Sequence, residues 1–195
     1  FGDDRPSPRT RVSVINFVGL PTLESQRPFL NQLAMTLFGW IEKNPDPGGR
    51  PLRGLLVIDE AKDYLPAQKA SVSNEGLMRL TAQARKYHLG IVLATQDPKE
   101  IDNKVVANCS THFYGKVNSP AAIEVVRDLI KQKGGTGEDV AKLSRGQFSV
   151  HNADAKLPAP VKVAVPLCLS RHPEHPLDES QILAKAAEAR KIGIR

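Results

Sequence analysis

The stretch Gly54-Leu55-Leu56-Val57-Ile58-Asp59-Glu60 runs without a polar residue until it ends in two adjacent carboxylates. Such a run is typical of a strand covered on both faces, as in a parallel sheet between helices. The carboxyl end of a parallel strand lies at the sheet edge where open α/β proteins bind nucleotides. Because Mg²⁺ prefers oxygen ligands, Asp59 and Glu60 are candidate site residues, and the pattern is typical of a Walker B strand. Taken alone, the dipeptide leaves open a simpler interpretation, a strand whose last Asp caps the next turn.

A second apolar run, residues 88–96, also ends in polar side chains, those of Thr95 and Gln96. Two buried strands that deliver polar groups to one edge indicate a site rather than two unrelated strand ends. In phosphoryl transfer an acid can polarise the attacking water, and an amide can orient or sense the γ-phosphate. Thr95 and Gln96 are therefore candidates for the second task.

Composition is that of an ordinary globular domain. The chain has 195 residues, of which 41% are hydrophobic and 25% are charged, so we expect one sizeable core, with or without a tail. The net charge of +6 is compatible with a polyanionic partner. Cys109 and Cys168 are far apart and fit neither a disulfide framework nor a zinc site, which favours a reducing cytoplasm.

Neither a membrane span nor a signal segment is visible, because no apolar run approaches the roughly 20 residues needed to cross a bilayer. The first residue is Phe1 rather than Met. We therefore expect that the numbering begins inside a longer natural protein, or after a cleaved or disordered segment.

Hydrophobic periodicity predicts an α/β alternation along the chain. Strands are expected at 11–18, 54–58, 88–96 and 111–117, with a further pair at 147–150 and 161–165. Helices are expected at 25–43, 75–87, 120–131 and 178–192.

A phosphate-cradling loop is missing from this sequence. Such a loop needs Gly-x-x-x-x-Gly-Lys-Ser/Thr, so that backbone N–H groups and the lysine wrap the phosphates. The glycine-rich run at 134–138 has no Lys-Ser/Thr and no buried strand before it. A nucleotide site built from these residues is therefore only half a site.

Several runs together resemble the HerA/FtsK-type P-loop ATPases, and most closely the bacterial HerA-like DNA translocases. These runs are 55–66 (LLVIDEAKDYLP), 80–98 (LTAQARKYHLGIVLATQDP), 103–120, 143–148 (LSRGQF) and 166–176 (PLCLSRHPEHP). The resemblance extends from about Arg11 to the C-terminus, with the runs in the family's order and spacing.

The resemblance implies an α/β fold, a RecA-like (ASCE P-loop NTPase) sheet flanked by helices. The sheet would be incomplete, because the P-loop strand and helix lie upstream. Residues 1–170 would form the C-terminal part of a RecA-like ATPase domain, and residues 171–195 a linker and a C-terminal helix. Such domains assemble as a hexameric ring.

The resemblance also implies site roles, with ATP and Mg²⁺ as cofactors. Asp59 would hold Mg²⁺ through water, Glu60 would polarise the attacking water, and Thr95 and Gln96 would lie at the nucleotide with Gln96 as the sensor. Arg85 matches an arginine finger that reaches the neighbouring subunit's nucleotide, although an arginine at a helix end is ordinarily a solvated cation. Lys62 stands where many relatives carry His or Gln, and we assign it no chemical role.

The function that follows is an ATP-driven translocase or helicase motor subunit acting on double-stranded DNA, cytoplasmic, homo-oligomeric and accompanied by a nuclease or effector partner. The isolated chain is expected to be inactive. The alternative is a non-catalytic oligomerisation or partner-docking module derived from such an ATPase. A nuclease lacks support, because Asp59, Glu60 and Asp63 have no accompanying Lys or His in a recognisable spacing.

Overall fold

The computed structural model describes residues 10, 12–17, 19–45, 52–67, 74–155, 159–166, 168, 175 and 177–191. The chain divides into two units, Phe1–Ala164 and Val165–Arg195. Helix α5 (Glu179–Lys191) belongs to the second unit, and every other helix and strand given below belongs to the first. Over the described ranges, no helix is both long enough and apolar enough to traverse a bilayer.

Helix α1 (Leu23–Lys43) begins at Thr22, whose hydroxyl accepts a hydrogen bond from the Ser25 N–H. Its buried face repeats at helical spacing and consists of Leu30, Ala34, Phe38 and Ile41. The helix predicted at 25–43 is therefore confirmed.

Helix α2 (Glu75–Gln83) is shorter than the helix predicted at 75–87. From Ala84 the chain tightens into the 3₁₀-helix η3 (Ala84–Tyr87), and His88 then takes a left-handed conformation with φ 58°. A 3₁₀ turn commonly closes an α-helix. As a result, the chain reverses directly into the next strand, and Arg85 lies in η3.

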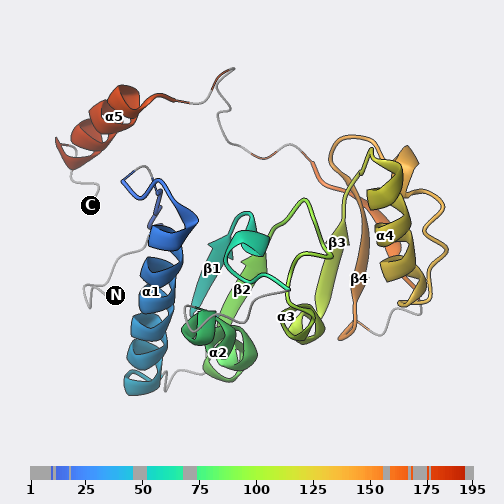
Figure 1. Cartoon of the computed structure of the whole chain (residues 1–195), viewed down its shortest axis with the longest axis horizontal. Coiled ribbons are helices and arrows are strands. Elements are labelled where there is room, and N and C mark those ends of the chain that lie inside the picture. The colour runs from blue at the N-terminus through green and yellow to red at the C-terminus, as the bar shows by residue number, and fades with distance from the viewer. Residues whose placement is uncertain are drawn as a thin grey trace. The chain divides into compact units, whose positions relative to one another are not determined.

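The central pair of strands is parallel, as predicted. Strand β1 (Gly54–Ile58) pairs with β2 (Leu89–Leu93) in a register that places Leu56 opposite Ile91. One face of this pair packs on α1 and α2, which lie together on the same side of the strands (Figure 1). The core there includes Leu30, Phe38, Ile58, Leu65, Leu77, Leu80, Ile101 and Val105.

The opposite face of β1 and β2 is open, which corrects the expectation of a strand covered on both faces. Leu55 and Val57 are 58% and 59% exposed, and Val92, which pairs with Val57, is 47% exposed. No described element covers these side chains. We refer to Leu55, Val57 and Val92 as the open face.

A second sheet is antiparallel, with the strand order β3 (Thr111–Tyr114), β4 (Gln147–Asn152), β5 (Val161–Ala164). The pairing of β4 with β5 was predicted, whereas the pairing of β3 with β4 was not. Helix α4 (Pro120–Lys131) coincides with its predicted bounds and packs beside these strands (Figure 1). A separate small core joins Tyr114, Val126, Ile130 and Val140.

The remaining elements are short: η1 (Ala61–Asp63), α3 (Asn103–Asn108) and η4 (Val140–Lys142). The strand predicted at 11–18 is wrong for residues 12–17, which pair with no described strand. Their alternating apolar side chains stay largely in solvent, since Val12 and Val14 are 80% and 86% exposed. Parallel strands flanked by helices confirm the α/β class.

Candidate functional site

The carboxyl ends of β1 and β2 remain joined beyond the last strand residues. The Ala94 N–H donates to the Ile58 carbonyl at 3.0 Å, and the Ala61 N–H donates to the Ala94 carbonyl at 2.8 Å. These bonds bring together the first loop, residues 59–67, and the second loop, residues 94–102. The four candidate residues Asp59, Glu60, Thr95 and Gln96 therefore share one end of the sheet.

Glu60 contacts Gln96 directly. Gln96 Nε2 donates to Glu60 Oε1 at 2.5 Å, although the two residues lie 36 positions apart in sequence. The second carboxylate oxygen, Glu60 Oε2, is buried and accepts no hydrogen bond within the described residues. A buried acceptor without a donor is costly, so this oxygen is suited to meet a group from outside the chain.

The backbone of Glu60 is also unusual. Its φ of 46° and ψ of 48° lie in the left-handed region, which a residue with a Cβ seldom adopts. This turn directs the chain from β1 into η1. Strained conformations of this kind cluster at functional sites.

Asp59 is exposed at the strand end, and its Oδ1 accepts the Glu60 N–H at 3.1 Å. Within the part of the chain that the structure describes, no three His, Cys, Asp or Glu side chains converge as a direct metal cage. A solvent-facing carboxylate fits Mg²⁺, which keeps several waters and uses few protein ligands. Asp59 is therefore suited to hold such an ion.

The side chain of Thr95 forms a hydrogen bond within its own loop. Its Oγ1 accepts the Asp97 N–H at 3.1 Å, and Gln96 extends from the turn that this bond closes. Thr95 therefore shapes the second loop, and its side chain is half-buried.

Lys62 joins the two loops, although the sequence indicated no role for it. Its Nζ lies 3.3 Å from Glu100 Oε2 and 3.7 Å from Asp97 Oδ2. The hydrogen bond to Glu100 raises the pKa of Lys62, with further raising contributions from the charges of Glu100, Asp97 and Glu60. The sequence signal that could have predicted these contacts was the presence of one lysine in the first loop and two acidic residues in the second.

Arg85 lies at the opposite end of the sheet from Glu60. It precedes the first residue of β2, and the bond from the Arg53 N–H to the His88 carbonyl marks the amino ends of both strands. Five-residue strands separate the two ends by about 16 Å. The Arg85 side chain is 88% exposed, and its Nη2 lies 3.9 Å from Asp154 Oδ1. The structure therefore does not bring Arg85 to the other four candidates.

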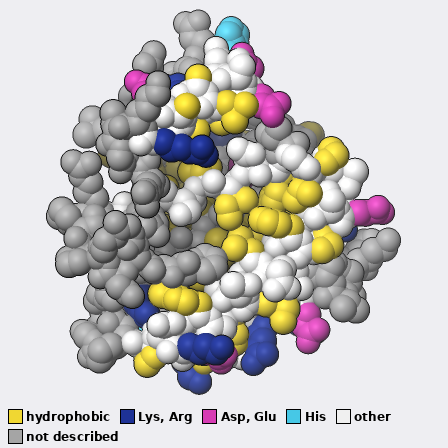
Figure 2. Space-filling view, turned by 90° about the vertical axis from the view of Figure 1, so that its left-hand side faces the viewer, with side chains coloured by type: hydrophobic (Ala, Val, Ile, Leu, Met, Phe, Trp, Pro, Cys, Tyr) yellow, Lys and Arg dark blue, Asp and Glu magenta, His cyan; other side chains and the backbone are white. Residues whose placement is uncertain are grey.

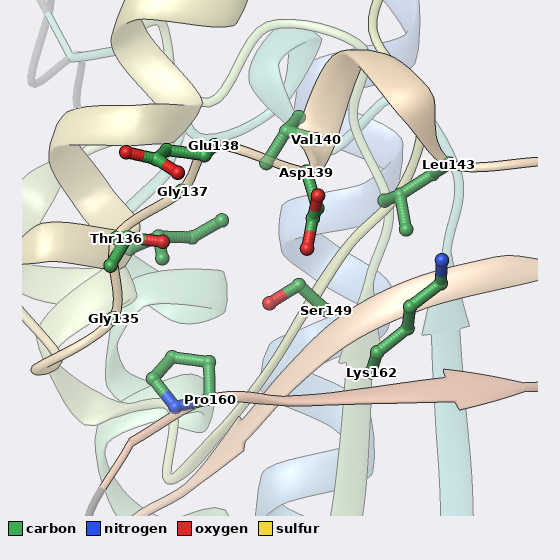
Figure 3. Close-up of a pocket in the computed structure, with 11 residues that line it drawn as sticks. Gly135, Thr136, Gly137, Glu138, Asp139, Val140, Leu143, Ser149, Pro160 and Lys162 are labelled. Carbon is green, nitrogen blue, oxygen red and sulfur yellow. The ribbon is translucent and has the colours of Figure 1, made fainter.

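A cavity of about 100 Å³ lies elsewhere, between the glycine-rich turn after α4 and the antiparallel sheet. Thr136, Asp139, Ser149 and Lys162 contribute polar groups to its wall (Figure 3). None of the predicted site residues lines it. The turn follows a helix rather than a strand, as expected for a loop that is not a phosphate cradle.

Comparison with known proteins identifies several relatives. The profile of the family described as Zonular occludens toxin (Zot) matches residues 32–127, just under half of the chain. A protein named "Probable DNA double-strand break repair helicase HerA" from Methanocaldococcus jannaschii is 26% identical over 117 residues, which are 56% of this chain and 22% of the relative. Protein P9 of Pseudoalteromonas phage PM2 is 34% identical over 80 residues, covering 41% of this chain and 34% of that protein.

Among solved structures, one match is the genome packaging NTPase B204 from Sulfolobus turreted icosahedral virus 2, in complex with ATP-gammaS. It has a TM-score of 0.45 and 18% identity, and the match covers 58% of this chain and 52% of that one. The HerA relative confirms the resemblance to HerA/FtsK-type ATPases that the sequence motifs predict. The chain spans about a fifth of the length of that relative.

Proposed function

We propose that this chain is the C-terminal part of the ATPase domain of a DNA translocase or helicase motor. The observation that carries the proposal is the meeting of Glu60 and Gln96 at the carboxyl end of the parallel strands, where one Glu60 oxygen has no donor in the part of the chain that the structure describes. An acid and an amide at this position suit the hydrolysis of a nucleoside triphosphate.

In this proposal each residue of the site has a distinct task. Asp59 holds Mg²⁺ through water, and the ion supplies charge neutralisation for the phosphates. Glu60 accepts a hydrogen bond from the attacking water and so polarises the water. Gln96, now bonded to Glu60, exchanges that partner for the γ-phosphate and so reports its presence, while Thr95 shapes the loop from which Gln96 extends.

Arg85 acts on a neighbouring subunit in this proposal. It lies far from Glu60 of its own chain and is almost fully exposed, as an arginine that reaches into a partner's site must be. An arginine supplied in trans requires a multimer, and we propose a hexamer that encircles double-stranded DNA. Positive side chains facing the pore would contact phosphates without reading bases.

The sheet is proposed to be completed by polypeptide upstream of Phe1 that carries the P-loop. The open face supports this, because three apolar side chains of a central strand pair stay in solvent. Residues 1–170 would then belong to the ATPase domain, and residues 171–195 would form a linker and terminal helix. The isolated chain is predicted not to hydrolyse ATP.

The test is DNA-stimulated ATP turnover by the full-length protein carrying Glu60→Gln. Loss of a general base lowers turnover by about 10²- to 10⁴-fold. Asp63→Asn is the matched control, since it removes the same charge three residues away and should leave turnover within about twofold of the wild type. Unchanged turnover in Glu60→Gln would refute the assignment of the base.

A second candidate, a non-catalytic assembly or docking module, is favoured by the missing P-loop motif together with the open face. The reading frame upstream of Phe1 distinguishes the two. A Gly-x-x-x-x-Gly-Lys-Ser/Thr run there supports the motor, and its absence supports the docking module. The mass of the full-length protein in solution with ATP and Mg²⁺ tests the ring.

A further inference from the structure

We propose that Lys62 is a positioning residue that holds the Gln96 segment of the second loop against the turn carrying Glu60. The inference rests on the proposed function, because it assigns a role within the same site. Its basis is the pair of contacts from Lys62 Nζ to Asp97 and Glu100, which join the two loops through side chains.

Among the described residues, backbone hydrogen bonds join the second loop to the first only near the two ends of the second loop. The Ala61 N–H bonds to Ala94 at one end. At the other end the Ala67 N–H bonds to the Glu100 carbonyl at 2.8 Å, and the Asp102 N–H bonds to the Leu65 carbonyl at 2.9 Å. Pro66 and Ile101 form an isolated antiparallel bridge in the same place.

Gln96 and Asp97 lie between these two anchored ends. In this stretch the described contacts to the first loop are made by side chains, Gln96 with Glu60 and Asp97 with Lys62. Because Asp97 is the next residue after Gln96, the ion pair restricts the backbone from which the Gln96 amide extends. The Lys62–Glu100 contact restricts the return of the same loop.

The surroundings of Lys62 suit this role. Its side chain is only 26% exposed, whereas those of Asp97 and Glu100 are 54% and 61% exposed, so the lysine is the more constrained partner. The charged groups that act on it are Glu100, Asp97 and Glu60, all of which favour its protonated form. Lys62 therefore stays charged across the physiological pH range.

Three variants of the full-length protein test the proposal: Lys62→Met, Lys62→Arg and Lys99→Met. Lys62→Met keeps the length of the side chain and loses its charge, so Gln96 should be held less well. We expect kcat to fall about two- to fivefold, the range that a partly exposed ion pair supplies, with the KM for ATP unchanged. Lys62→Arg can reach both acids and should restore most of the loss.

Lys99→Met is the matched control, because Lys99 is an exposed lysine between Asp97 and Glu100 in the same loop. Its kcat should stay at the wild-type value. In addition, Lys62→Met/Glu100→Gln should be no slower than Lys62→Met alone, since both changes break the same contact.

Thermal unfolding, measured in parallel, separates positioning from simple support of the fold. A lower melting temperature with unchanged kcat in Lys62→Met overturns the inference, and so does a failure of Lys62→Arg to restore kcat. If the wild-type full-length protein shows no ATP turnover at all, the proposed function fails instead, so the two failures are distinct.

Discussion

Glu60 carries two energetic costs in a single residue. Its backbone is left-handed, and one of its carboxylate oxygens is buried with no donor among the described residues. For an L-residue with a Cβ, the left-handed conformation costs roughly 1–2 kcal/mol. A less strained residue at this position would make the fold more stable. We therefore attribute the presence of Glu60 to a role in the chemistry of the site.

Comparing Glu60→Gly with Glu60→Ala isolates the backbone cost. Both changes remove the carboxylate and its bond to Gln96, but only glycine adopts a positive φ without strain. We expect the free energy of unfolding of Glu60→Gly to be about 1 kcal/mol greater than that of Glu60→Ala, as measured by urea denaturation. Equal stability of the two variants would show that the turn is not strained.

At the scale of elements, α1 and α2 approach each other closely at Gly76. The Gly76 N–H donates to Asn31 Oδ1 at 2.7 Å, and a Cβ on Gly76 would meet Met35 Cγ and approach Asn31 Oδ1 to 2.8 Å. The two helices can therefore lie this close only where α2 has no side chain. Their contact in turn supports the covered face of β1 and β2.

Gly76→Ala tests this contact, and Gly39→Ala is its control. We expect Gly76→Ala to lower the free energy of unfolding by about 1–3 kcal/mol, because the new methyl group overpacks the interface. A Cβ on Gly39 in α1 would meet no heavy atom of the other described elements within 4 Å, so Gly39→Ala should leave the free energy of unfolding unchanged or raise it by about 0.5–1 kcal/mol. Urea denaturation of both variants provides the comparison, and similar effects in the two would contradict the packing argument.

Elements with local signals were predictable from the sequence. Helix α4 has the predicted bounds because its apolar residues repeat at helical spacing, and the structure adds that Ser119 caps it and that Pro120 lies in its first turn. Residues 12–17 have the alternation of a strand, yet a strand needs a neighbour with which to pair. The pairing of β3 with β4 and the open face depend likewise on contacts between distant segments, which local patterns do not contain.

In the candidate site, too, the sequence predicted what depends on local patterns and missed what depends on contacts between distant segments. Asp59, Glu60, Thr95 and Gln96 could be placed at one end of the sheet because parallel strands bring their carboxyl ends together. The Glu60–Gln96 bond and the Lys62 contacts could not be predicted, since they depend on loop conformation. Arg85 was assigned to a finger by resemblance alone, and that role stays a prediction.

On the scale of the molecule, the two ends of the parallel strands carry opposite charge. Acidic residues dominate the carboxyl end, whereas Arg53 precedes β1, and Arg85 and Lys86 precede β2. Helix α1 also ends in Lys43, and it runs toward the lower margin of Figure 1. In Figure 2, which is turned about the vertical axis, Lys and Arg side chains gather at that margin. Ends of opposite charge suit head-to-tail contact between copies.

Mixing two inactive full-length variants tests this arrangement. Arg85→Ala should lose about 10³-fold or more in turnover, and Glu60→Gln should also be inactive. In mixed rings an Arg85→Ala subunit supplies Glu60 beside a neighbour that supplies Arg85, so about a quarter of the sites in an equimolar mixture should become competent. Steady-state ATP turnover after subunit exchange measures the recovery.

A chain with both substitutions is the control for this mixture. Combined with either single variant it cannot complete any site, so no turnover should return. Absence of recovery in the first mixture, with rings of normal mass, would place Arg85 outside the neighbour's site.

The uncovered side chains Leu55, Val57 and Val92 have a practical consequence for purified material. Apolar side chains exposed to water favour association, so concentrated samples of these 195 residues should self-associate through the open face. Such clusters would form without nucleotide and would bury the same face that we propose is covered by upstream polypeptide. A particle size measured on these 195 residues alone would then reflect this self-association, so the proposed ring has to be tested on the full-length protein.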